Sequence, residues 1–292
     1  MDRFDFGRYK LVACDMDGTL LADDHTVHAL HREAARICAE HGVLFAICSG
    51  RSYVALRPFL ETLPECSHVI AYNGGRVSTG DLRTELFRKP LKTSDVLDVL
   101  KLAPVYDATA CIWADEKLYV NRRNHLAESY GKLCGCEYHL MEPGDVSFIK
   151  SSGDGESNVD KIFWFDEPSR ADEIANDIRP KVPAGAAFMQ SGPGCMEFID
   201  RTVSKGNAVL RLAEMLGIDP GDVIAFGDAE NDLSMIEAAG LGIAMGNAAE
   251  TVKRSADHIT DTNNNDGVYV AIAELFGSKD RKRPSDGGTT NG

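Results

Sequence analysis

Two aspartates lie close together near the start of the chain, in the segment 15–20 (DMDGTL), directly after the apolar run 11–14. In an extended backbone, residues two apart point the same way, so Asp15 and Asp17 can face one site. Gly18 allows the sharp turn that such a site needs at the end of a strand. Because two carboxylates this close repel each other, the pair indicates a divalent cation.

A second acidic segment, 227–232 (GDAEND), follows the apolar run 223–226. Its carboxylates, Asp228 and Asp232, are oxygen ligands of the kind that Mg²⁺ prefers in octahedral sites. Either aspartate could instead serve only as the cap of the following helix. Together with the first pair of aspartates, a metal site is the favoured interpretation.

Two shorter features suit the oxygens of a phosphate group. Residues 49–51 (SGR) end the apolar run 43–48, where a hydroxyl, a flexible glycine and backbone N–H groups at a helix start can bind such an oxygen. Lys205 begins a helix late in the chain and could hold the same group. Each feature is weak by itself. For Lys205 the reason is that a lysine at a helix start is more often a solvated surface charge.

The segments that carry these residues alternate between short apolar runs and helical patterns. Such alternation predicts a parallel sheet covered by helices on both faces, with ligands bound at the carboxyl ends of the strands. The pattern occurs before residue 80 and resumes after residue 204. It predicts strands at 11–14, 43–48, 68–71, 223–226 and 242–245 and helices at 29–41, 53–60, 205–216, 232–239, 249–255 and 268–275.

The middle of the chain has a different pattern, in which turn signals near 80–81 and 114–116 predict hairpins. Helices are predicted there at 93–102, 124–133 and 169–179, and further strands at 161–166, 187–190 and 196–200. This mixture predicts an inserted α+β domain with a largely antiparallel sheet. The expected divisions are a core domain in two parts, 1–83 and 201–277, an inserted domain, 84–200, and a disordered tail, 278–292, that has no apolar residue to bury.

Taken in order, the four chemical features resemble the haloacid dehalogenase superfamily of phosphotransferases, and more narrowly its Cof-type (type IIB) sugar-phosphatase-like branch. Segment 15–20 resembles the first motif of that family, 49–51 the second, Lys205 the third and 227–232 the fourth. The resemblance covers nearly the whole folded chain. It implies an α/β fold, with a Rossmann-like parallel-sheet core domain and an inserted α+β cap domain. Supporting signatures are Asn73-Gly74, 244–248, Ala256-Asp257 and 266–268.

The resemblance also implies an activity and a role for each motif residue. It implies a Mg²⁺-dependent phosphatase that works through an aspartyl-phosphate intermediate. Asp15 would attack phosphorus, and Asp17 would protonate the leaving oxygen and then deprotonate the water that hydrolyses the intermediate. The implied phosphate contacts are Ser49, Gly50, Lys205 and Asn231, and the implied Mg²⁺ ligands are Asp15, the backbone carbonyl of Asp17, Asp228 and, directly or through water, Asp232.

Other functions remain open at this point. A phosphomutase on the same scaffold is the closest alternative, because some relatives in the family transfer the phosphoryl group to a second hydroxyl. Receiver-type signalling modules also combine an acceptor aspartate, acidic ligands and a lysine, but they are about half as long and lack the segment 15–20. A non-catalytic protein of this fold would normally have lost Asp15 or Asp17, and both are present.

The bulk composition narrows the possible partners and the compartment. With 292 residues and a net charge of −14, the chain is a poor candidate for nonspecific binding to nucleic acid or to an anionic membrane. No window approaches the ~18 consecutive apolar residues of a membrane helix. Several of the eight cysteines lie in apolar runs, which predicts reduced thiols and a cytoplasmic protein.

The expected partner is therefore a small phosphomonoester. Sugar phosphates are the favoured class, but other small polyol phosphates and pyridoxal phosphate also fit the motifs. Aromatic and basic residues of the inserted domain could contact the leaving group, or could equally be ordinary packing and surface residues. These candidates are Trp113, Tyr119, Arg122, Arg123 and His125. The motifs do not bear on the oligomeric state.

Overall fold

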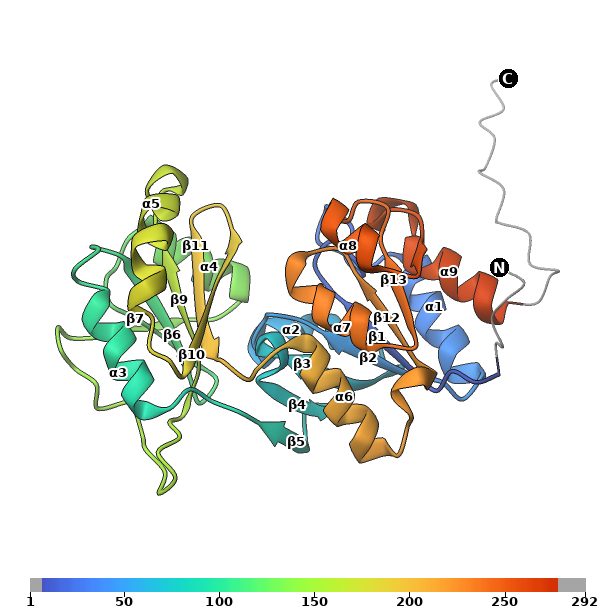
Figure 1. Ribbon diagram of the computed structural model, residues 1–292, viewed down its shortest axis with the longest axis horizontal. Coiled ribbons are helices and arrows are strands. Elements are labelled where there is room, and N and C mark those ends of the chain that lie inside the picture. Colours follow the sequence, from blue (N-terminus) through green and yellow to red (C-terminus); the bar gives the residue numbers. More distant parts are fainter. Residues whose placement is uncertain (1–6, 278–292) are drawn as a thin grey trace.

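The computed structural model describes residues 7–277, which form two β-sheets with helices packed against them (Figure 1). The sheets belong to two lobes, and two segments of the chain connect these lobes (Figure 1). The predicted tail, 278–292, lies outside the described residues. No helix within residues 7–277 combines the length and the apolar character that crossing a bilayer requires.

The first sheet contains the strands that carry the motifs. In chain order its strands are β1 (Leu11–Asp15), β2 (Leu44–Cys48), β3 (Cys66–Ala71), β4 (Arg76–Thr79), β5 (Glu85–Arg88), β12 (Val223–Gly227), β13 (Leu241–Ala244) and β14 (His258–Ile259). They lie in the order β14-β13-β12-β1-β2-β3-β4-β5. The first six in this order run parallel, whereas β4 pairs antiparallel with β3 and β5 pairs antiparallel with β4. The predicted α/β core with a Rossmann-like parallel sheet is confirmed.

Helices cover both faces of this sheet. They include α1 (Ala29–Glu40), α2 (Tyr53–Leu60), α6 (Lys205–Leu216), α7 (Leu233–Ala238), α8 (Glu250–Ser255) and α9 (Gly267–Phe276). α1 packs on α9 at one face and α6 packs on α7 at the other (Figure 1). The Ser204 side chain accepts a hydrogen bond from the Asn207 N–H at the start of α6, and Gly217 ends that helix in the left-handed conformation. The cap at Ser204 fixes the start of α6, and Lys205 is the first residue of that helix.

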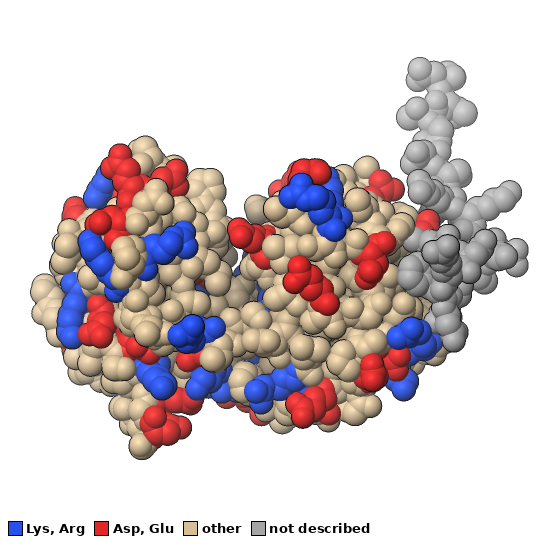
Figure 2. Space-filling model, in the orientation of Figure 1, with Lys and Arg blue, Asp and Glu red and all other residues tan. Residues whose placement is uncertain are grey.

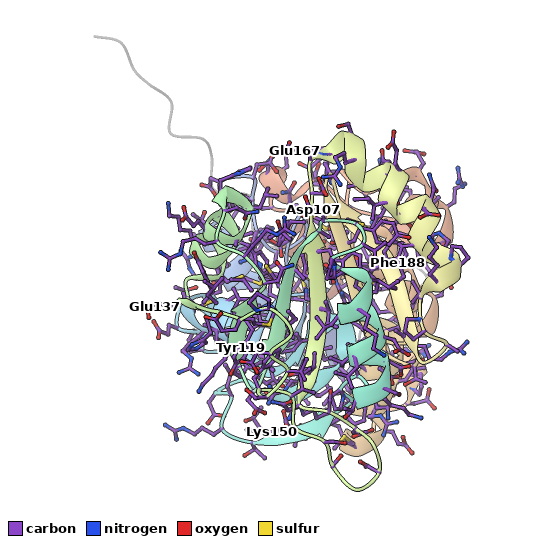
Figure 3. All side chains as sticks on the ribbon, turned by 90° about the vertical axis from the view of Figure 1, so that its left-hand side faces the viewer. Asp107, Tyr119, Glu137, Lys150, Glu167 and Phe188 are labelled. Atoms are coloured by element: carbon purple, nitrogen blue, oxygen red, sulfur yellow. The ribbon has the colours of Figure 1, made fainter. Side chains whose placement is uncertain are left out.

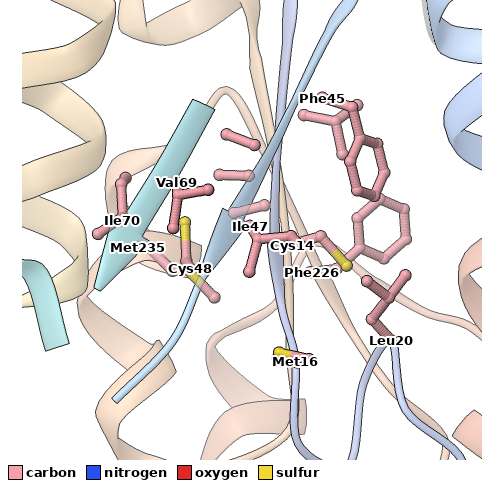
Figure 4. Close-up of a cluster of buried hydrophobic side chains, with 14 of the residues drawn as sticks. Cys14, Met16, Leu20, Phe45, Ile47, Cys48, Val69, Ile70, Phe226 and Met235 are labelled. Atoms are coloured by element: carbon pink, nitrogen blue, oxygen red, sulfur yellow. The ribbon is translucent and has the colours of Figure 1, made fainter. Parts of the chain in front are cut away.

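The core of the first lobe lies between the sheet and these helices, as Figure 4 shows. All five residues of β1 are buried, which suits a parallel strand covered on both faces. Cys14 lies near Phe226 in this core and Cys48 lies near Met235, where cysteine behaves as a small hydrophobic residue (Figure 4). Burial raises the pKa of both thiols, so they stay protonated at neutral pH. The strand that ends at Asp15 is therefore buried in a core without thiolate charge.

The second lobe is built on a six-stranded sheet. Its strands are β6 (Thr109–Ala114), β7 (Lys117–Val120), β8 (Tyr138–Leu140), β9 (Val159–Phe165), β10 (Ala186–Gly192) and β11 (Cys195–Asp200). They lie in the order β10-β11-β9-β6-β7-β8, and among the described strands of this second sheet only the β7–β8 pair is parallel. The predicted α+β insert with a largely antiparallel sheet is therefore present.

One face of the second sheet is covered by α3 (Thr93–Leu102) and α5 (Pro168–Ile178), which lie in front of the strands in Figure 3. Alternate residues of β9 and β11, including Ile162, Trp164 and Phe198, pack against these helices. The residues between them must point to the opposite face, because side chains alternate along a strand. That opposite face is turned toward the first lobe (Figure 1).

The first sheet extends further along the chain than expected. We expected the first part of the core to end at residue 83, but β5 pairs with β4 and adds an eighth strand to that sheet. The reason is the turn near residues 80–81, which returns the chain antiparallel to β4, with Val77 opposite Phe87. The first lobe thus includes residues up to 88.

Candidate active site

The chemically competent segments meet at one edge of the first sheet. β1 lies between β2 and β12, and all three strands run parallel, so their carboxyl ends point the same way. Asp15 is the last residue of β1, Ser49 follows β2, and Asp228 follows β12. The sheet topology therefore brings three of the predicted motifs together.

Three carboxylates form an acidic cluster at this edge. One oxygen each of Asp15, Asp228 and Asp232 lies within 4.8 Å of the others. Asp15 and Asp232 are buried, and Asp228 is partly buried. Burial and the neighbouring charge of Asp232 raise the pKa of Asp15 well above its usual range, and burial raises the pKa of Asp228 to about 6. Positive charge nearby is therefore needed to keep Asp15 and Asp228 ionised.

Lys205 supplies part of that charge. Its side chain is 1% exposed, and its ammonium group contacts the carboxylates of Asp15 and of Asp232, the latter at 2.6 Å. Burial opposes the charge on this lysine, but the two carboxylates outweigh burial and raise its pKa. The preceding residue, Ser204, packs so closely on Gly74 that a Cβ there would lie 2.3 Å from the Ser204 carbonyl oxygen. Lys205 is therefore positioned by a tight backbone contact and held as a cation.

Hydrogen bonds orient the two carboxylates of the second acidic segment. The Thr19 hydroxyl donates to Asp228 Oδ1 at 2.8 Å. Asp232 Oδ2 accepts from the backbone N–H groups of Asp228 and Ala229, both at 3.0 Å, while Oδ1 faces Lys205. Asp232 thus holds the turn that precedes α7 and belongs to the acidic cluster, but its side chain makes no cap hydrogen bond to α7 itself. Its role as a metal ligand stays a prediction.

Asp17 lies at the rim of the site. Its side chain is 49% exposed and pairs with Arg51, whose Nε donates to Oδ2 at 2.8 Å and whose Nη2 donates to Oδ1 at 2.5 Å. Within residues 7–277, the close acidic cluster does not include the Asp17 carboxylate. The resemblance assigns the backbone carbonyl of Asp17 to the metal, and that role stays a prediction. The Asp17 side chain lies outside the acidic cluster and can contact a substrate at the rim of the site.

The residues predicted to contact phosphate lie around the acidic cluster. Ser49 is buried, and its Oγ accepts from the Arg51 N–H at 3.2 Å. Asn231 Nδ2 donates to Asn73 Oδ1 at 3.1 Å. A Cβ on Gly50 would lie 2.9 Å from the same Asn73 oxygen, so glycine at this position allows the close approach. The structure brings these residues together, and their contact with phosphate stays a prediction.

A cleft of about 350 Å³ lies above these residues, between the two lobes. Figure 2 shows a notch between the lobes on one face of the molecule. The first lobe contributes Asp15, Asp17, Gly50, Asn73 and Asn231, among others. The second lobe contributes Tyr130, Leu133, Cys134, Lys161, Phe163, Ser191, Cys195 and Glu197. The cleft thus has an acidic floor and a mixed polar and apolar roof.

The five candidates for leaving-group contact in the second lobe are not among the residues that line this cleft in the described part of the chain. Trp113 is buried and donates from its indole N–H to the Tyr130 hydroxyl at 2.9 Å. Tyr119 stacks on Phe148 with the ring centroids 4.2 Å apart, on the side of the sheet seen in Figure 3. The other three are partly or fully exposed. They are packing and surface residues, as one of the two interpretations had it.

Two cleft residues, Lys161 and Glu197, were not singled out in the sequence, although it contains a signal for them. Glu197 lies between two apolar residues, in Met196-Glu197-Phe198, and Lys161 directly precedes the apolar residue Ile162; both segments read as buried strands. Lys161 and Glu197 are both buried, with 4% and 5% exposure. Charged side chains are rarely buried without a partner, so such positions point to a polar site on the far face of the strand.

The acidic cluster fits a divalent cation. Its donors are carboxylate oxygens alone, which suits hard Mg²⁺ better than a softer metal. Three carboxylates share the charge of one lysine, Lys205, so this lysine alone does not balance their charge. Asp15, Asp228 and Asp232 could hold the ion, and the Thr19 hydroxyl would orient Asp228 from outside.

We expect the change of Gly18 to alanine to weaken Mg²⁺ binding about tenfold or more. Gly18 has a φ of +82°, and a Cβ there would lie 2.5 Å from Asp228 Oδ2. The new methyl group must therefore displace a residue of the acidic cluster, and displaced supporting contacts typically cost 10- to 100-fold in metal affinity. Calorimetric titration of the variant with Mg²⁺ measures this loss.

Gly42→Ala is the matched control for that variant. Gly42 has a φ of +70°, but a Cβ there would meet nothing within 4 Å. Both variants pay the cost of a left-handed alanine, about 1–2 kcal/mol of unfolding free energy, whereas only Gly18→Ala disturbs Asp228. Equal Mg²⁺ affinity in the two variants would show that the contact between Gly18 and Asp228 has no part in metal binding.

Known proteins share both the sequence and the fold. A family model described as haloacid dehalogenase-like hydrolase matches residues 12–272. The protein YxeH of Bacillus subtilis (strain 168) is 32% identical over 280 residues, which cover 93% of this chain and 100% of YxeH. The 5-amino-6-(5-phospho-D-ribitylamino)uracil phosphatase YcsE of the same bacterium is 31% identical over 265 residues, which cover 90% of this chain and 94% of YcsE.

A solved structure extends this likeness to three dimensions. The crystal structure of a haloacid dehalogenase-like hydrolase from Bacteroides thetaiotaomicron matches with a TM-score of 0.80 and 26% identity, covering 92% of this chain and 100% of that one. The match includes both lobes, since it spans nearly the whole described chain. The resemblance carried by the four motifs is confirmed, and the chain belongs to the haloacid dehalogenase-like hydrolases.

Proposed function

We propose that the protein is a Mg²⁺-dependent phosphohydrolase that acts on small phosphomonoesters, with sugar phosphates as the favoured class, through a phosphorylated Asp15. The observation that carries this proposal is the Asp15 carboxylate in the floor of the cleft, in contact with Lys205 and within 4.8 Å of two further carboxylates. A carboxylate held this way can attack a phosphorus atom placed above it in line with the leaving oxygen.

The proposed reaction has two steps, and Asp17 takes part in both. In the first step Asp15 bonds to phosphorus and the leaving oxygen departs with a proton from Asp17. In the second step water gives a proton to Asp17 and bonds to phosphorus, while the bond from phosphorus to the Asp15 oxygen breaks, so that phosphate leaves and the Asp15 carboxylate is restored. In the structure the Asp17 carboxylate pairs with Arg51 at the rim of the cleft. This pair must open before Asp17 can reach the leaving oxygen.

The charges explain why a metal is needed. Asp15, Asp228 and Asp232 bring three negative charges and a phosphomonoester brings up to two more, while Lys205 returns only one. Bound Mg²⁺ would supply positive charge that offsets this repulsion and stabilises the charge developing on the phosphoryl oxygens. Ser49, Gly50, Lys205 and Asn231 would hold those oxygens from the protein side.

The two lobes have separate roles in this proposal. Residues 201–277 and the first part of the chain form the core that carries the chemistry, and the six-stranded lobe acts as a cap that contacts the leaving group. The relative YcsE is named for a phosphorylated ribityl compound, and such a polyol chain fits the favoured class. We keep the cytoplasm as the proposed compartment, since six of the eight cysteines are buried in the structure.

Phosphate release from a panel of small phosphomonoesters, with Mg²⁺ and again with EDTA, tests the proposal. We expect release that depends on Mg²⁺ and falls to the background level with EDTA, because the acidic cluster then repels the substrate. Re-addition of Mg²⁺ after EDTA should restore the activity and serves as the control. Release that is unaffected by EDTA would contradict the metal site. Transfer of the phosphoryl group to a second hydroxyl, without release, would identify a phosphomutase instead.

A further inference from the structure

A buried ion pair forms part of the cleft on the side of the second lobe. Lys161 lies on β9 and Glu197 on β11, on the face of the sheet that is turned toward the first lobe. Their side chains are 5% and 6% exposed, and Lys161 Nζ lies 3.2 Å from Glu197 Oε2. The mechanism described above uses neither residue. Placing two charges in such a buried position costs free energy, so a binding role for them is a reasonable hypothesis.

The hydrogen bonds of Lys161 leave one donor available. An ammonium group has three N–H donors. Lys161 donates one to the carbonyl oxygen of Gly50 at 2.8 Å and one to Glu197 at 3.2 Å. The Phe163 ring lies beside the ammonium, with its centroid 4.9 Å from Nζ, and limits access by water. Within residues 7–277 the third N–H has no acceptor, and the side chain lines the cleft.

The carboxylate of Glu197 has a matching free acceptor. Its Oε2 accepts hydrogen bonds from Lys161 and from Asn73 Nδ2, the latter at 3.0 Å. Its Oε1 accepts none from the part of the chain that the structure describes. Lys161 and Glu197 therefore place one free donor and one free acceptor next to each other in the cleft. A hydroxyl group, which accepts one hydrogen bond and donates another, satisfies both at once.

We infer that Lys161 and Glu197 form a specificity site for a hydroxyl group of the leaving group, so that the enzyme selects phosphate esters of polyols and sugars over alkyl or aryl phosphates. This inference rests on the proposed phosphatase function and adds the residues that choose the substrate. A leaving group without a hydroxyl leaves the free N–H and the free oxygen unpaired in a buried place, and such a loss discriminates strongly between substrates.

The site is joined directly to the predicted phosphate contacts. Lys161 bonds to the carbonyl oxygen of Gly50, and Glu197 bonds to Asn73, which in turn accepts from Asn231. Asn73 has a φ of +57°, a conformation that asparagine adopts more readily than most residues but still at a cost. The strained turn aims the Asn73 side chain at both lobes. A leaving group bound by the pair would therefore be held at a fixed position relative to Asp15.

A purely structural role is the competing explanation, since the same contacts hold the second lobe on the first. A different residue, Glu116, makes a comparable connection outside the cleft. Glu116 lies in the turn between β6 and β7 and accepts from the Tyr72 hydroxyl at 2.9 Å and from Arg76 at 2.5 Å. The cleft lining in the described chain does not include it. Glu116 therefore offers a control for the loss of a contact between the lobes.

The test compares two esters that differ only in the hydroxyl groups of a five-carbon chain, ribitol 5-phosphate and n-pentyl phosphate. We expect wild-type enzyme to favour the ribitol ester in kcat/KM. The double variant Lys161→Met with Glu197→Met should lower the ratio of the two kcat/KM values by about 10- to 100-fold, the loss expected for hydrogen bonds to charged groups. The double variant leaves no unpaired buried charge, so it should fold even where a single variant does not.

Glu116→Met is the control, and it should leave the ratio of the two kcat/KM values unchanged even if both values fall. A wild-type ratio near one would overturn the inference, as would an unchanged ratio in the double variant or an equal fall in Glu116→Met. Hydrolysis of pentyl phosphate with an unchanged ratio would leave the phosphatase function in place and remove only the specificity site. Absence of release from any ester would remove both.

Discussion

Replacement of Asp15 by asparagine is expected to lower phosphate release by at least about 10⁴-fold while the protein stays folded. The carboxylate of Asp15 is the group that forms the bond to phosphorus in the proposed mechanism, and a neutral amide is a far weaker nucleophile. Removal of a nucleophile in enzymes with covalent intermediates typically costs 10⁴- to 10⁶-fold in kcat. Asparagine has the same shape, so the buried strand β1 and the contacts around it should be kept.

The measurement is kcat on the best ester of the panel, together with thermal unfolding and intact mass, because deamidation of the new asparagine would restore aspartate. Asp160→Asn is the matched control. Asp160 is also a buried carboxylate, paired with Arg88 at 2.8 Å, but it does not line the cleft in the described chain. We expect this control to lose stability and to keep activity. Substantial activity in Asp15→Asn, with the mass of the asparagine form, would remove Asp15 as the nucleophile.

Much of the fold follows from local sequence signals. The structure has α2, α3 and α6 with the same bounds as the predicted helices 53–60, 93–102 and 205–216. α2 and α6 begin after a serine that caps the first turn, and α6 ends at a glycine in the left-handed conformation. The apolar runs predicted most of the parallel strands because both faces of those strands are buried. Local pattern and tertiary environment agree at these places.

The short strands at the sheet edges could not be predicted in this way. β8 (Tyr138–Leu140) and β14 (His258–Ile259) are too short to show a period, and each exists because a longer neighbouring strand supplies its hydrogen bonds. The boundary near residue 83 has the same origin. β5 has no fully buried residue, and pairing with β4 places it in the first sheet.

Part of the candidate site could also be predicted from the sequence, and part could not. The core residues Asp15, Ser49 and Asp228 could be placed together from sequence, because each follows a strand and parallel strands end at one edge. The contribution of the second lobe depends on which face of its sheet is turned toward the first lobe, and sequence does not give that choice. Once the face is known, strand alternation identifies Lys161 and Glu197 directly.

Replacement of Lys205 by methionine should have the second large effect, on both activity and stability. Lys205 is buried between Asp15 and Asp232 and contacts both carboxylates. Removing one partner of a buried ion pair typically costs about 3–5 kcal/mol of unfolding free energy, because a charge is left without compensation. We also expect kcat to fall by about 10²- to 10³-fold, because the variant lacks the proposed electrostatic contact between Lys205 and the phosphoryl oxygens. Denaturant unfolding without metal and steady-state kinetics with Mg²⁺ measure the two effects.

The loss of stability in Lys205→Met should depend on pH and on Mg²⁺. Burial raises the pKa of Asp228 to about 6 in the folded protein, so this group binds a proton more readily when folded than when unfolded. Its contribution to stability is therefore present in acid and is lost as the pH rises from about 4 through about 6. Without Lys205 the pKa of Asp228 should rise further, so this loss should be larger and extend to higher pH, and saturating Mg²⁺ should restore much of the stability at neutral pH.

Lys161→Met is the matched control for this prediction, because Lys161 is also a buried lysine in an ion pair, but it lies outside the acidic cluster. Both variants should be destabilised without metal, and Mg²⁺ should rescue only Lys205→Met. The comparison separates the charge of the acidic cluster from the general cost of breaking a buried ion pair. Equal rescue of both variants, or rescue of neither, would mean that Lys205 and the metal do not share the task of neutralising Asp15, Asp228 and Asp232.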